Sequence, residues 1–287
     1  IGNAVEATPL VQALRMFWPE CNLTLFISAG DLFDEWCVPD RIVNSVDEIS
    51  GETFDHTFLT YSTHWGKPDW FTECNPGRIH RIKQYFNHVC LKPEREYNMD
   101  MVRRLGFKVS APPLYVSLKK KNEVFEKKGL RICFVPGGKD EPRWHYKRWP
   151  YYNQLAELIF KEYPESEIYI IGTLKDDVDE NLSKLPYVRD LRGKPTLSEA
   201  AWIFKQVDIV IGNDCGPMHI ADAVGSKGII LFGPTCDLKN SPRNKIHSLY
   251  SDVACRPCQY EGPIECDDPR CILNITPEKV MAELLNL

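Results

Sequence analysis

The sequence predicts an α/β protein whose C-terminal half forms a parallel, doubly wound sheet. From residue 130 onward, apolar segments rich in β-branched residues alternate with segments of helical periodicity. Strands separated by helices of about ten residues connect by right-handed crossovers and pair in parallel. Glycine turns at 137–138 and 212–216 follow two of these strands. Ligands bind such sheets beyond the carboxyl ends of the strands, so both turns are expected to face one cleft.

The composition excludes several classes of protein. A chain of 287 residues with 43% hydrophobic residues is long enough for two domains. The net charge of −5 argues against nucleic-acid binding through phosphate neutralisation. No apolar run is long enough to span a bilayer, and no signal-peptide pattern occurs at the start. Eleven cysteines without a secretion signal indicate a reducing compartment. We therefore expect a cytoplasmic protein.

The N-terminal half begins with an amphipathic helix over residues 1–18, because its apolar positions repeat at helical spacing. Strands are predicted over 22–28 and, more weakly, over 54–60, and a helix over 78–91. The first helix has no strand before it, and the chain begins with Ile rather than Met. This pattern favours a βαβ unit whose first strand precedes residue 1.

Two prolines at 112–113 and the basic stretch 118–129 predict the connection between domains. We expect an N-terminal domain over 1–118 and a C-terminal domain over 119–287, with a cysteine-rich insertion at 255–271. The basic stretch could touch anionic lipid, but acidic residues interspersed in it favour a solvated face.

The C-terminal half is predicted to be a regular series of strands and helices. The predicted strands are 131–138, 167–173, 187–194, 207–211 and 228–232, and the predicted helices are 150–163, 175–184, 197–206, 216–224 and 276–287.

The segment 207–235 carries the strongest functional signal. A buried strand ends at a sharp turn, and a helix opens at Gly216 with Pro217 in its first turn. Free backbone N–H groups and the positive end of the helix dipole make such a turn an anion site, most naturally for phosphate. The alternative is that Asp214 only caps the helix and Gly216 only makes the turn.

A basic loop follows the other glycine turn. It carries Lys139, Arg143, Lys147 and Arg148 in an otherwise acidic protein. Cations beside a glycine turn suit a diphosphate whose charge grows as it departs. The alternative is a solvated basic loop.

Two stretches give these signals a family. NDCGPMHIADAVG followed by LFGPT, and IGNAVEATPLVQALRMFWP at the start, resemble the signatures of glycosyltransferase family 9, the bacterial ADP-heptose:lipopolysaccharide heptosyltransferases. The resemblance implies the GT-B fold, two facing Rossmann-like domains with the active site in the cleft between them. It implies inverting transfer of a sugar, heptose by analogy, from a nucleotide-diphosphate donor, ADP-heptose, to a lipopolysaccharide core or other glycan acceptor.

The resemblance also assigns donor-binding residues. In the family, the turn and helix corresponding to Asp214, Cys215, Gly216 and His219 hold the diphosphate. Cys215 stands where serine or threonine is usual, so a hydroxyl contact is lost. The basic loop contributes Lys147, which matches the family's lysine before Trp-Pro, and more weakly Gly138, Lys139 and Arg143. The segment 190–197 borders the nucleotide base and contributes Lys194, Pro195 and Thr196.

The catalytic base is the point where this chain departs from the family. The usual base is the aspartate of an IGD motif, and here Asn3 occupies its place. Glu6 lies about one helical turn further on and could accept the proton instead. Otherwise Glu6 is a first-turn acid that favours the helix dipole. Loss of the base leaves a second possibility, a nucleotide-sugar-binding protein without transferase activity; a nucleotide-sugar 2-epimerase is a third.

The cysteine-rich segment predicts a metal site. Cys255, Cys258, Cys266 and Cys271 form two pairs that could close a tetrahedral structural zinc site, and free thiols are the alternative. No cofactor is expected for catalysis. A lipid-linked acceptor would place the protein at the cytoplasmic face of the inner membrane.

Overall fold

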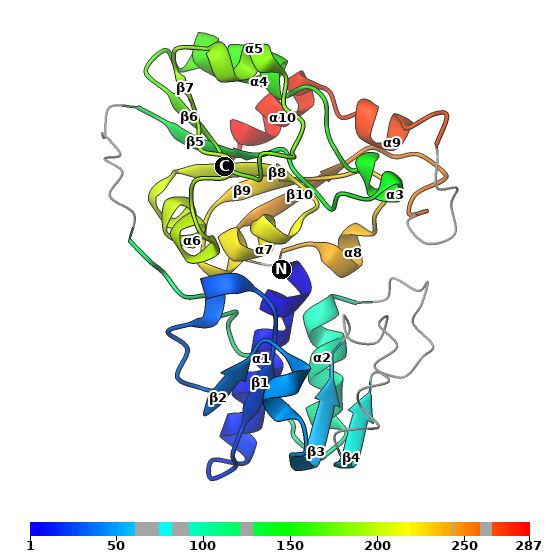
Figure 1. Cartoon of the computed structure of the whole chain (residues 1–287). Helices are drawn as coiled ribbons and strands as arrows, with labels where there is room; N and C mark the ends of the chain where they lie inside the picture. Colours follow the sequence, from blue (N-terminus) through cyan, green and yellow to red (C-terminus); the bar gives the residue numbers. More distant parts are fainter. Residues whose placement is uncertain (61–74, 82–91, 121–128, 243, 259–265) are drawn as a thin grey trace. The chain divides into compact units, whose positions relative to one another are not determined.

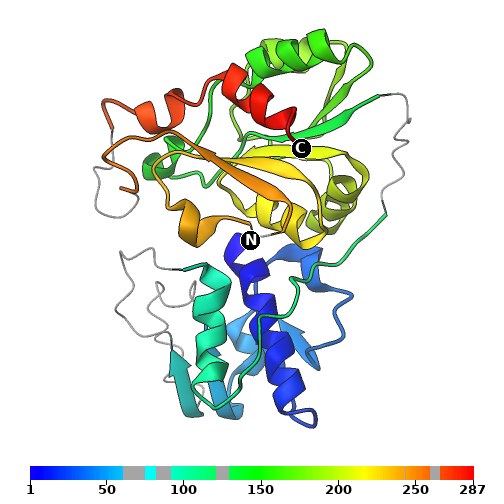
Figure 2. The same cartoon turned by 180° about the vertical axis from the view of Figure 1, so that it is seen from behind.

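The computed structural model describes residues 1–60, 75–81, 92–120, 129–242, 244–258 and 266–287. The chain forms two compact units, Ile1–Ser117 and Leu118–Leu287. Both contain parallel strands and helices, which confirms the predicted α/β class and its two Rossmann-like parts (Figures 1 and 2). In the described part of the chain, no helix is both long enough and apolar enough to cross a membrane.

The first unit contains two helices and two short parallel sheets. Its elements are α1 (Gly2–Phe17), β1 (Thr24–Phe26), β2 (Arg41–Val43), β3 (Thr53–Leu59), β4 (Asn75–Arg81) and α2 (Glu94–Arg103), with short 3₁₀ helices at Gly30–Phe33 and Val46–Ile49. Strand β1 pairs with β2, and β3 pairs with β4. Helices α1 and α2 pack on each other through Leu10, Leu14, Tyr97 and Met101.

Helix α1 tolerates a proline in its interior. Pro9 has no N–H, so it cannot bond to the carbonyl of Val5 four residues earlier. The hydroxyl of Thr8 donates to that carbonyl instead, at 2.8 Å. The same hydroxyl accepts the N–H of Tyr115 at 3.0 Å, so it also joins the helix to the last segment of the unit.

The predicted helix over residues 78–91 is wrong at its start. Strand β4 continues to Arg81 and pairs with β3, with His56 opposite Arg78. Gly77 makes this close pairing possible, because a Cβ there would lie 2.9 Å from the carbonyl oxygen of Asp55. Residues 82–91 lie outside the described part of the chain. Strand pairing between distant segments overrode the local helical pattern.

The second unit is built on a six-stranded parallel sheet. Its strands are β5 (Arg131–Val135), β6 (Glu167–Ile170), β7 (Val188–Asp190), β8 (Ile209–Asn213), β9 (Gly228–Phe232) and β10 (Ile246–Tyr250), in the order β10-β9-β8-β5-β6-β7. Its helices are α3 (Pro142–His145), α4 (Tyr152–Glu162), α5 (Glu180–Lys184), α6 (Leu197–Gln206), α7 (Gly216–Ala223), α8 (Asp237–Asn240), α9 (Arg270–Leu273) and α10 (Pro277–Leu284).

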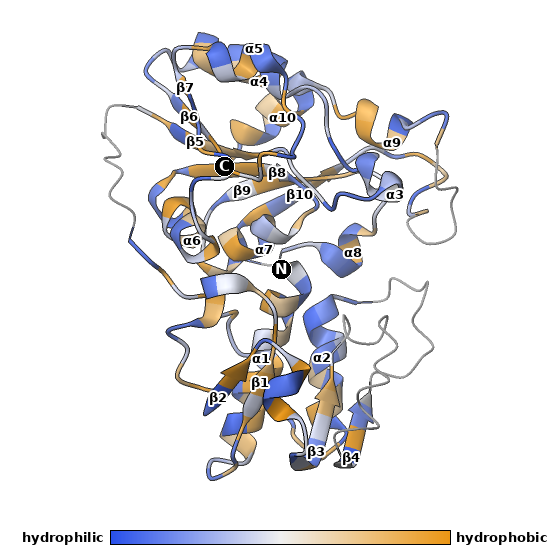
Figure 3. Ribbon diagram, viewed as in Figure 1, coloured by the Kyte–Doolittle hydropathy of each residue, from blue (hydrophilic) through white to orange (hydrophobic). Residues whose placement is uncertain are grey.

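Helices cover both faces of this sheet. Helices α4, α5 and α10 lie on one face, and α6 and α7 lie on the other (Figures 1 and 2). The central strands are largely hydrophobic along their length, as expected for strands buried on both sides (Figure 3). Residues such as Ile132, Phe134, Ile211 and Leu231 form the core with α4 and α10.

Several predicted boundaries differ from the structure; for example, the strand predicted over 187–194 ends at Asp190. The helix predicted from 175 begins only at Glu180, because Asp179 accepts the N–H of Asn181 and caps it there. The strand predicted over 167–173 ends at Ile170, and β8 continues to Asn213, past the glycine expected to break it.

Candidate functional site

The two glycine turns lie side by side at the topological switch point of the sheet. Strands β5 and β8 are neighbours, with Val135 opposite Gly212, and the chain departs in opposite directions along the sheet from these two strands. In open α/β sheets, ligands bind outside the carboxyl ends of the strands at this point. The expectation that the two turns share one edge is therefore met within the second unit.

Asn213 ties the two turns together. Its side-chain oxygen accepts the backbone N–H of Trp149 and the hydroxyl of Tyr152, both at 3.1 Å. Its amide nitrogen donates to the carbonyls of Pro136 and Gly137. The side chain is fully buried, and its hydrogen bonds fix both ends of the basic loop against β8. No motif in the sequence assigns a role to Asn213, although its place at the end of a buried strand is a signal.

Glycine is required at two positions of this edge. A Cβ at Gly212 would lie 2.5 Å from the sulfur of Met218 and 2.8 Å from the Cβ of Val135. A Cβ at Gly137 would lie 2.4 Å from the carboxylate of Asp176. Both distances are too short for a side chain, so these glycines let the two strands, α7 and the loop after β6 approach one another.

Lys147 and Asp214 form a buried ion pair where the two turns meet. The ammonium nitrogen of Lys147 lies 2.9 Å from Oδ2 of Asp214, and the side chains are 13% and 4% exposed. The ammonium also lies 5.2 Å from the ring centroid of Trp144. Asn240 donates to the same carboxylate oxygen at 3.2 Å. Burial would raise the pKa of Asp214, but the charge of Lys147 and hydrogen bonds to the carboxylate outweigh it and hold that pKa below its usual value.

The capping alternative for Asp214 is wrong, because Cys215 is the N-cap residue of α7. The Cys215 side chain makes no capping hydrogen bond, so it does not satisfy the N–H groups at the helix start. Burial and the charge of Asp214 raise the pKa of Cys215 to about 12, and the group is a neutral thiol at physiological pH. Gly216 and Pro217 open the helix as predicted, and His219 is buried in its first turns.

The other cations of the basic loop have different surroundings. Lys139 is exposed and pairs with Glu141 at 2.7 Å. Gly138 has open space where a side chain would project, so its backbone is accessible. The backbone of Arg143 lies in α3, and its side chain lies outside what the structure describes. Of the predicted cations with described side chains, Lys147 is therefore the one joined to the turn after β8.

The segment predicted to border a nucleotide base follows β7, two strands from β5 on the same edge. The ammonium of Lys194 donates to the carbonyl of Asp190 at 2.6 Å. The Thr196 hydroxyl accepts the N–H of Glu199 and forms a capping box at the start of α6. Pro195 lies between them. Two strand spacings are about 10 Å, a distance that a nucleoside can bridge.

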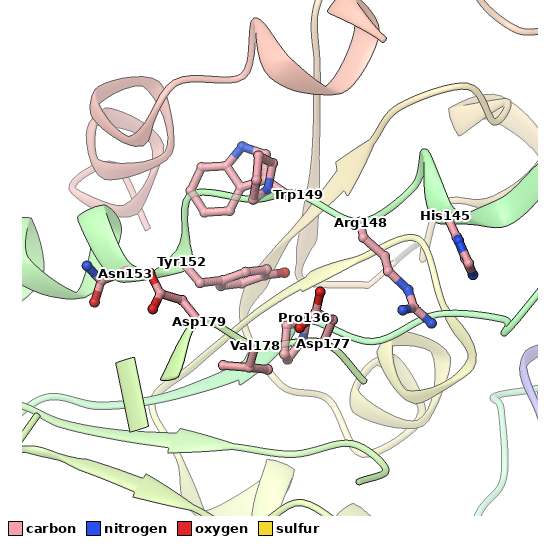
Figure 4. Close-up of a pocket in the computed structure, with 10 residues that line it drawn as sticks. Pro136, His145, Arg148, Trp149, Tyr152, Asn153, Asp177, Val178 and Asp179 are labelled. Atoms are coloured by element: carbon pink, nitrogen blue, oxygen red, sulfur yellow. The ribbon is translucent and has the colours of Figure 1, made fainter. Parts of the chain in front are cut away.

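A cavity of about 440 Å³ lies beside the basic loop (Figure 4). Figure 4 shows Arg148 and His145 at one end, Trp149 and Tyr152 between, and Asn153 and Asp179 at the other end. The remaining lining comes from Pro136, Pro150, Asp177 and Val178. Lys147 and Asp214 are not among the lining residues, so the basic loop contacts the cavity and the ion pair through different side chains.

The two predicted catalytic positions lie in the first unit, on α1. Asn3 is in the first turn, and Glu6 follows one turn later. The guanidinium of Arg95 contacts both carboxylate oxygens of Glu6, with Nε 3.1 Å from Oε2. Asn98 donates to the carbonyl of Glu6 at 3.1 Å. Glu6 is thus held by α2, a contact that sequence spacing could not reveal.

The four predicted metal ligands differ in exposure. Cys255 is exposed, Cys258 and Cys266 are partly buried, and Cys271 is buried. Burial first, and then the neighbouring thiols, raise the pKa of Cys271 to about 11. Among the residues that the structure describes, no three His, Cys, Asp or Glu side chains are arranged to hold a metal ion. The zinc site therefore stays a prediction.

Comparisons with known proteins support the assignment suggested by the sequence. The family model for glycosyltransferase family 9 (heptosyltransferase) matches residues 97–265. Lipooligosaccharide heptosyltransferase 2 of Haemophilus influenzae is 30% identical over 166 residues, which cover 54% of this chain and 46% of that protein. Lipopolysaccharide heptosyltransferase 2 of Escherichia coli K12 is 26% identical over 162 residues, 53% of this chain and 45% of that protein. The matched stretch spans about half the length of these relatives.

Solved structures show the fold alone. ADP-heptose lps heptosyltransferase II of E. coli superposes with a TM-score of 0.69 at 16% identity, over 99% of this chain and 95% of that one. TibC from enterotoxigenic E. coli H10407, an iron-containing dodecameric glycosyltransferase, gives a TM-score of 0.69 at 13% identity, over 100% of this chain and 75% of that one.

Proposed function

Because this chain belongs to glycosyltransferase family 9, we propose that it transfers heptose from ADP-heptose to a lipopolysaccharide core or other glycan acceptor, with inversion at the sugar carbon. The observation that carries this proposal is the buried pair of Lys147 and Asp214 between two turns at the switch point of the sheet. The acceptor class comes from the names of the relatives, which are lipooligosaccharide and lipopolysaccharide heptosyltransferases. The donor comes from the name of a structural neighbour, ADP-heptose lps heptosyltransferase II.

The diphosphate of the donor would bind at the start of α7. Backbone N–H groups of the first turn and the positive end of the dipole favour negative charge there. Lys147 lies beside this turn and carries the charge that can stabilise the departing diphosphate. The accessible backbone at Gly138 allows close approach from the other turn. Lys139, Arg143, His219 and the base-facing Lys194, Pro195 and Thr196 complete the proposed donor set.

The acceptor hydroxyl needs a base, and Glu6 is our proposal for it. Asn3 cannot take a proton at neutral pH, and Glu6 is the carboxylate one turn further along α1. Arg95 fixes the orientation of this carboxylate. The substitution at Asn3 also favours the second candidate, a protein that binds a nucleotide sugar without transferring it. The family match does not favour the 2-epimerase.

Two further features belong to the proposal. We place the protein in the cytoplasm, at the membrane face where a lipid-linked acceptor would be available. We also propose that Cys255, Cys258, Cys266 and Cys271 bind one structural zinc ion, because two closely spaced thiol pairs suit tetrahedral coordination. No catalytic cofactor is proposed.

The proposal is tested by titrating the protein with ADP in a calorimeter. Lys147→Ala should raise the dissociation constant about 10- to 150-fold, because a hydrogen bond to a charged group contributes about 1.5–3 kcal/mol. Lys147→Gln, which keeps a donor for Asp214, separates loss of charge from an unpaired buried carboxylate. Lys184→Ala is the matched control, since this lysine is exposed and pairs only with Glu180 in the described contacts of α5.

The possible outcomes are distinct. Unchanged affinity in both Lys147 variants would remove this residue from the donor site. Failure of the wild type to bind ADP would contradict the nucleotide proposal as a whole. Binding of ADP-heptose without transfer to any lipopolysaccharide core acceptor would favour the binding protein over the transferase.

A further inference from the structure

Arg256 connects the cysteine-rich segment to the edge of the sheet where the proposed donor site lies. It stands between Cys255 and Cys258, and its side chain is only 8% exposed. Its Nε donates to the carbonyl of Gly233 at 2.8 Å, and one terminal nitrogen donates to the carbonyl of Thr235 at 3.1 Å. The N–H of Cys258 donates to the carbonyl of Pro234 at 3.0 Å. Arg256 and Cys258 therefore hold the loop directly after β9 through hydrogen bonds to three consecutive carbonyls.

This loop contacts the basic loop on one side. A Cβ at Gly233 would lie 2.9 Å from the carbonyl oxygen of Tyr146, so the two backbones pack directly on each other. Tyr146 immediately precedes Lys147 in the chain. A shift of the loop after β9 would consequently disturb the backbone that carries Lys147.

The same guanidinium is also connected to Asp214 indirectly, through α8. Its terminal nitrogen lies 3.2 Å from Oδ1 of Asp237, the first residue of α8. Asn240, at the other end of this one-turn helix, donates to Oδ2 of Asp214 at 3.2 Å. Arg256 thus holds α8, whose Asn240 donates a hydrogen bond to Asp214. The loop after β9, which Arg256 also holds, packs against Tyr146, the residue before Lys147.

We propose that Arg256, near the start of the cysteine-rich segment, is a positioning residue for the Lys147–Asp214 pair and thereby controls the affinity of the donor site. The inference rests on the proposed function, because it takes this pair as part of the diphosphate site. In the described contacts, Arg256 touches none of the proposed donor-binding residues; it acts through the loop after β9 and through α8. The ring of Tyr250, 4.5 Å from the guanidinium carbon, holds the cation in place.

A guanidinium suits this task better than an ammonium. Arg256 donates to two carbonyls and a carboxylate in fixed directions, and the planar fork meets all three acceptors at once. Lysine has the charge but a single nitrogen, so it can replace only part of the set. Glutamine has neither the charge nor the reach, and would leave buried carbonyls without a donor.

The experiment measures ADP binding by calorimetry in the full chain. Arg256→Gln should weaken binding about 3- to 30-fold, the range for a residue that acts on a site through intervening contacts. Arg256→Lys should give an intermediate loss. Arg270→Gln is the matched control in the same segment, because Arg270 is 68% exposed and pairs with Asp268 at the surface. Circular dichroism of each variant checks that it is folded.

A double variant distinguishes positioning from a general loss of stability. If Arg256 acts through the ion pair, Arg256→Gln combined with Lys147→Ala should bind ADP no more weakly than Lys147→Ala alone. Losses that multiply in full would overturn the inference, as would unchanged ADP affinity in Arg256→Gln.

A second measurement needs no nucleotide. Acylation of lysines by an N-hydroxysuccinimide ester, followed by mass spectrometry, reports the accessibility of Lys147, with exposed Lys184 as the internal reference. Arg256→Gln should raise labelling of Lys147 severalfold relative to Lys184, and Arg270→Gln should not. If the wild type fails to bind ADP, the proposed function fails and this labelling still decides the role of Arg256. Equal labelling in wild type and Arg256→Gln would overturn it.

Discussion

Asp214 illustrates how a residue's role depends on neighbours that are distant in sequence. Its position before α7 allows two interpretations, a helix cap or part of a turn whose backbone N–H groups bind phosphate. In the structure Cys215 is the N-cap, and Asp214 holds the ammonium of Lys147 in a buried ion pair. Sequence motifs identified both residues, but only the parallel pairing of β5 with β8 brings them together. The ion pair between Lys147 and Asp214 could not be predicted, because it depends on side-chain packing between two loops.

The substitution Glu6→Gln should keep ADP binding and lower the rate of heptose transfer by about 10²- to 10⁴-fold, the usual contribution of a positioned general base. Glutamine is nearly isosteric, and it can still accept a hydrogen bond from Arg95, so the fold around α1 should survive. The rate is measured with ADP-heptose and a lipopolysaccharide core acceptor.

Asn3→Asp is the complementary variant, since it restores the family's usual acid and should raise the rate. Undiminished turnover in Glu6→Gln would place the base elsewhere in the chain. No turnover in either the wild type or Asn3→Asp would favour a nucleotide-sugar-binding protein.

Among the elements, burial decides which ones the sequence could predict. Strands β5, β8 and β9 consist mostly of apolar residues buried on both faces, and all three were predicted with ends that differ by at most three residues. Strand β10 was missed because, at the edge of the sheet, it alternates buried Ile246 with exposed His247 and carries polar residues. Helix α2 was missed because its sequence is polar overall, although Tyr97 and Met101 bury it against α1.

The cysteine-rich segment, which follows β10, is predicted to bind a metal ion. Protein purified without added metal should contain about one equivalent of zinc, because four thiolates complete a tetrahedral site. Inductively coupled plasma mass spectrometry measures zinc and iron together.

Cys255→Ser with Cys258→Ser should abolish the bound metal, while Cys21→Ser, in the first unit, should leave it unchanged. Folded, reduced protein without any metal would contradict the zinc site. One equivalent of iron would keep the site and change its metal.

For the whole molecule, the division into two units separates the proposed tasks. All proposed donor-binding residues belong to the unit Leu118–Leu287, and both proposed catalytic positions belong to Ile1–Ser117. Each unit has a hydrophobic core of its own. The predicted boundary between residues 118 and 119 depends on a proline-rich, basic segment that precedes regular strands. Neither motif nor composition predicts the contacts that hold each unit together.

A fragment of residues 118–287 should therefore fold cooperatively and bind ADP within about tenfold of the full chain, a difference of about 1.4 kcal/mol. Urea denaturation followed by circular dichroism tests folding, and calorimetry tests binding. The same fragment should show no transfer activity, because it lacks α1. A fragment that folds but loses ADP binding entirely would assign part of the donor site to the first unit.

The strand order has a consequence for how the two halves of the donor unit relate to each other. Strands β5, β6 and β7 follow one another from the middle of the sheet to one edge, and β8, β9 and β10 follow one another from the middle to the other edge. The two runs are thus related by a pseudo-twofold axis, and the turns after β5 and β8 are equivalent positions of the two repeats. The repeats have diverged in chemistry, since one turn leads into the loop of cations and the other into a carboxylate and a helix start. A diphosphate bound on this axis would meet a different half-site from each repeat.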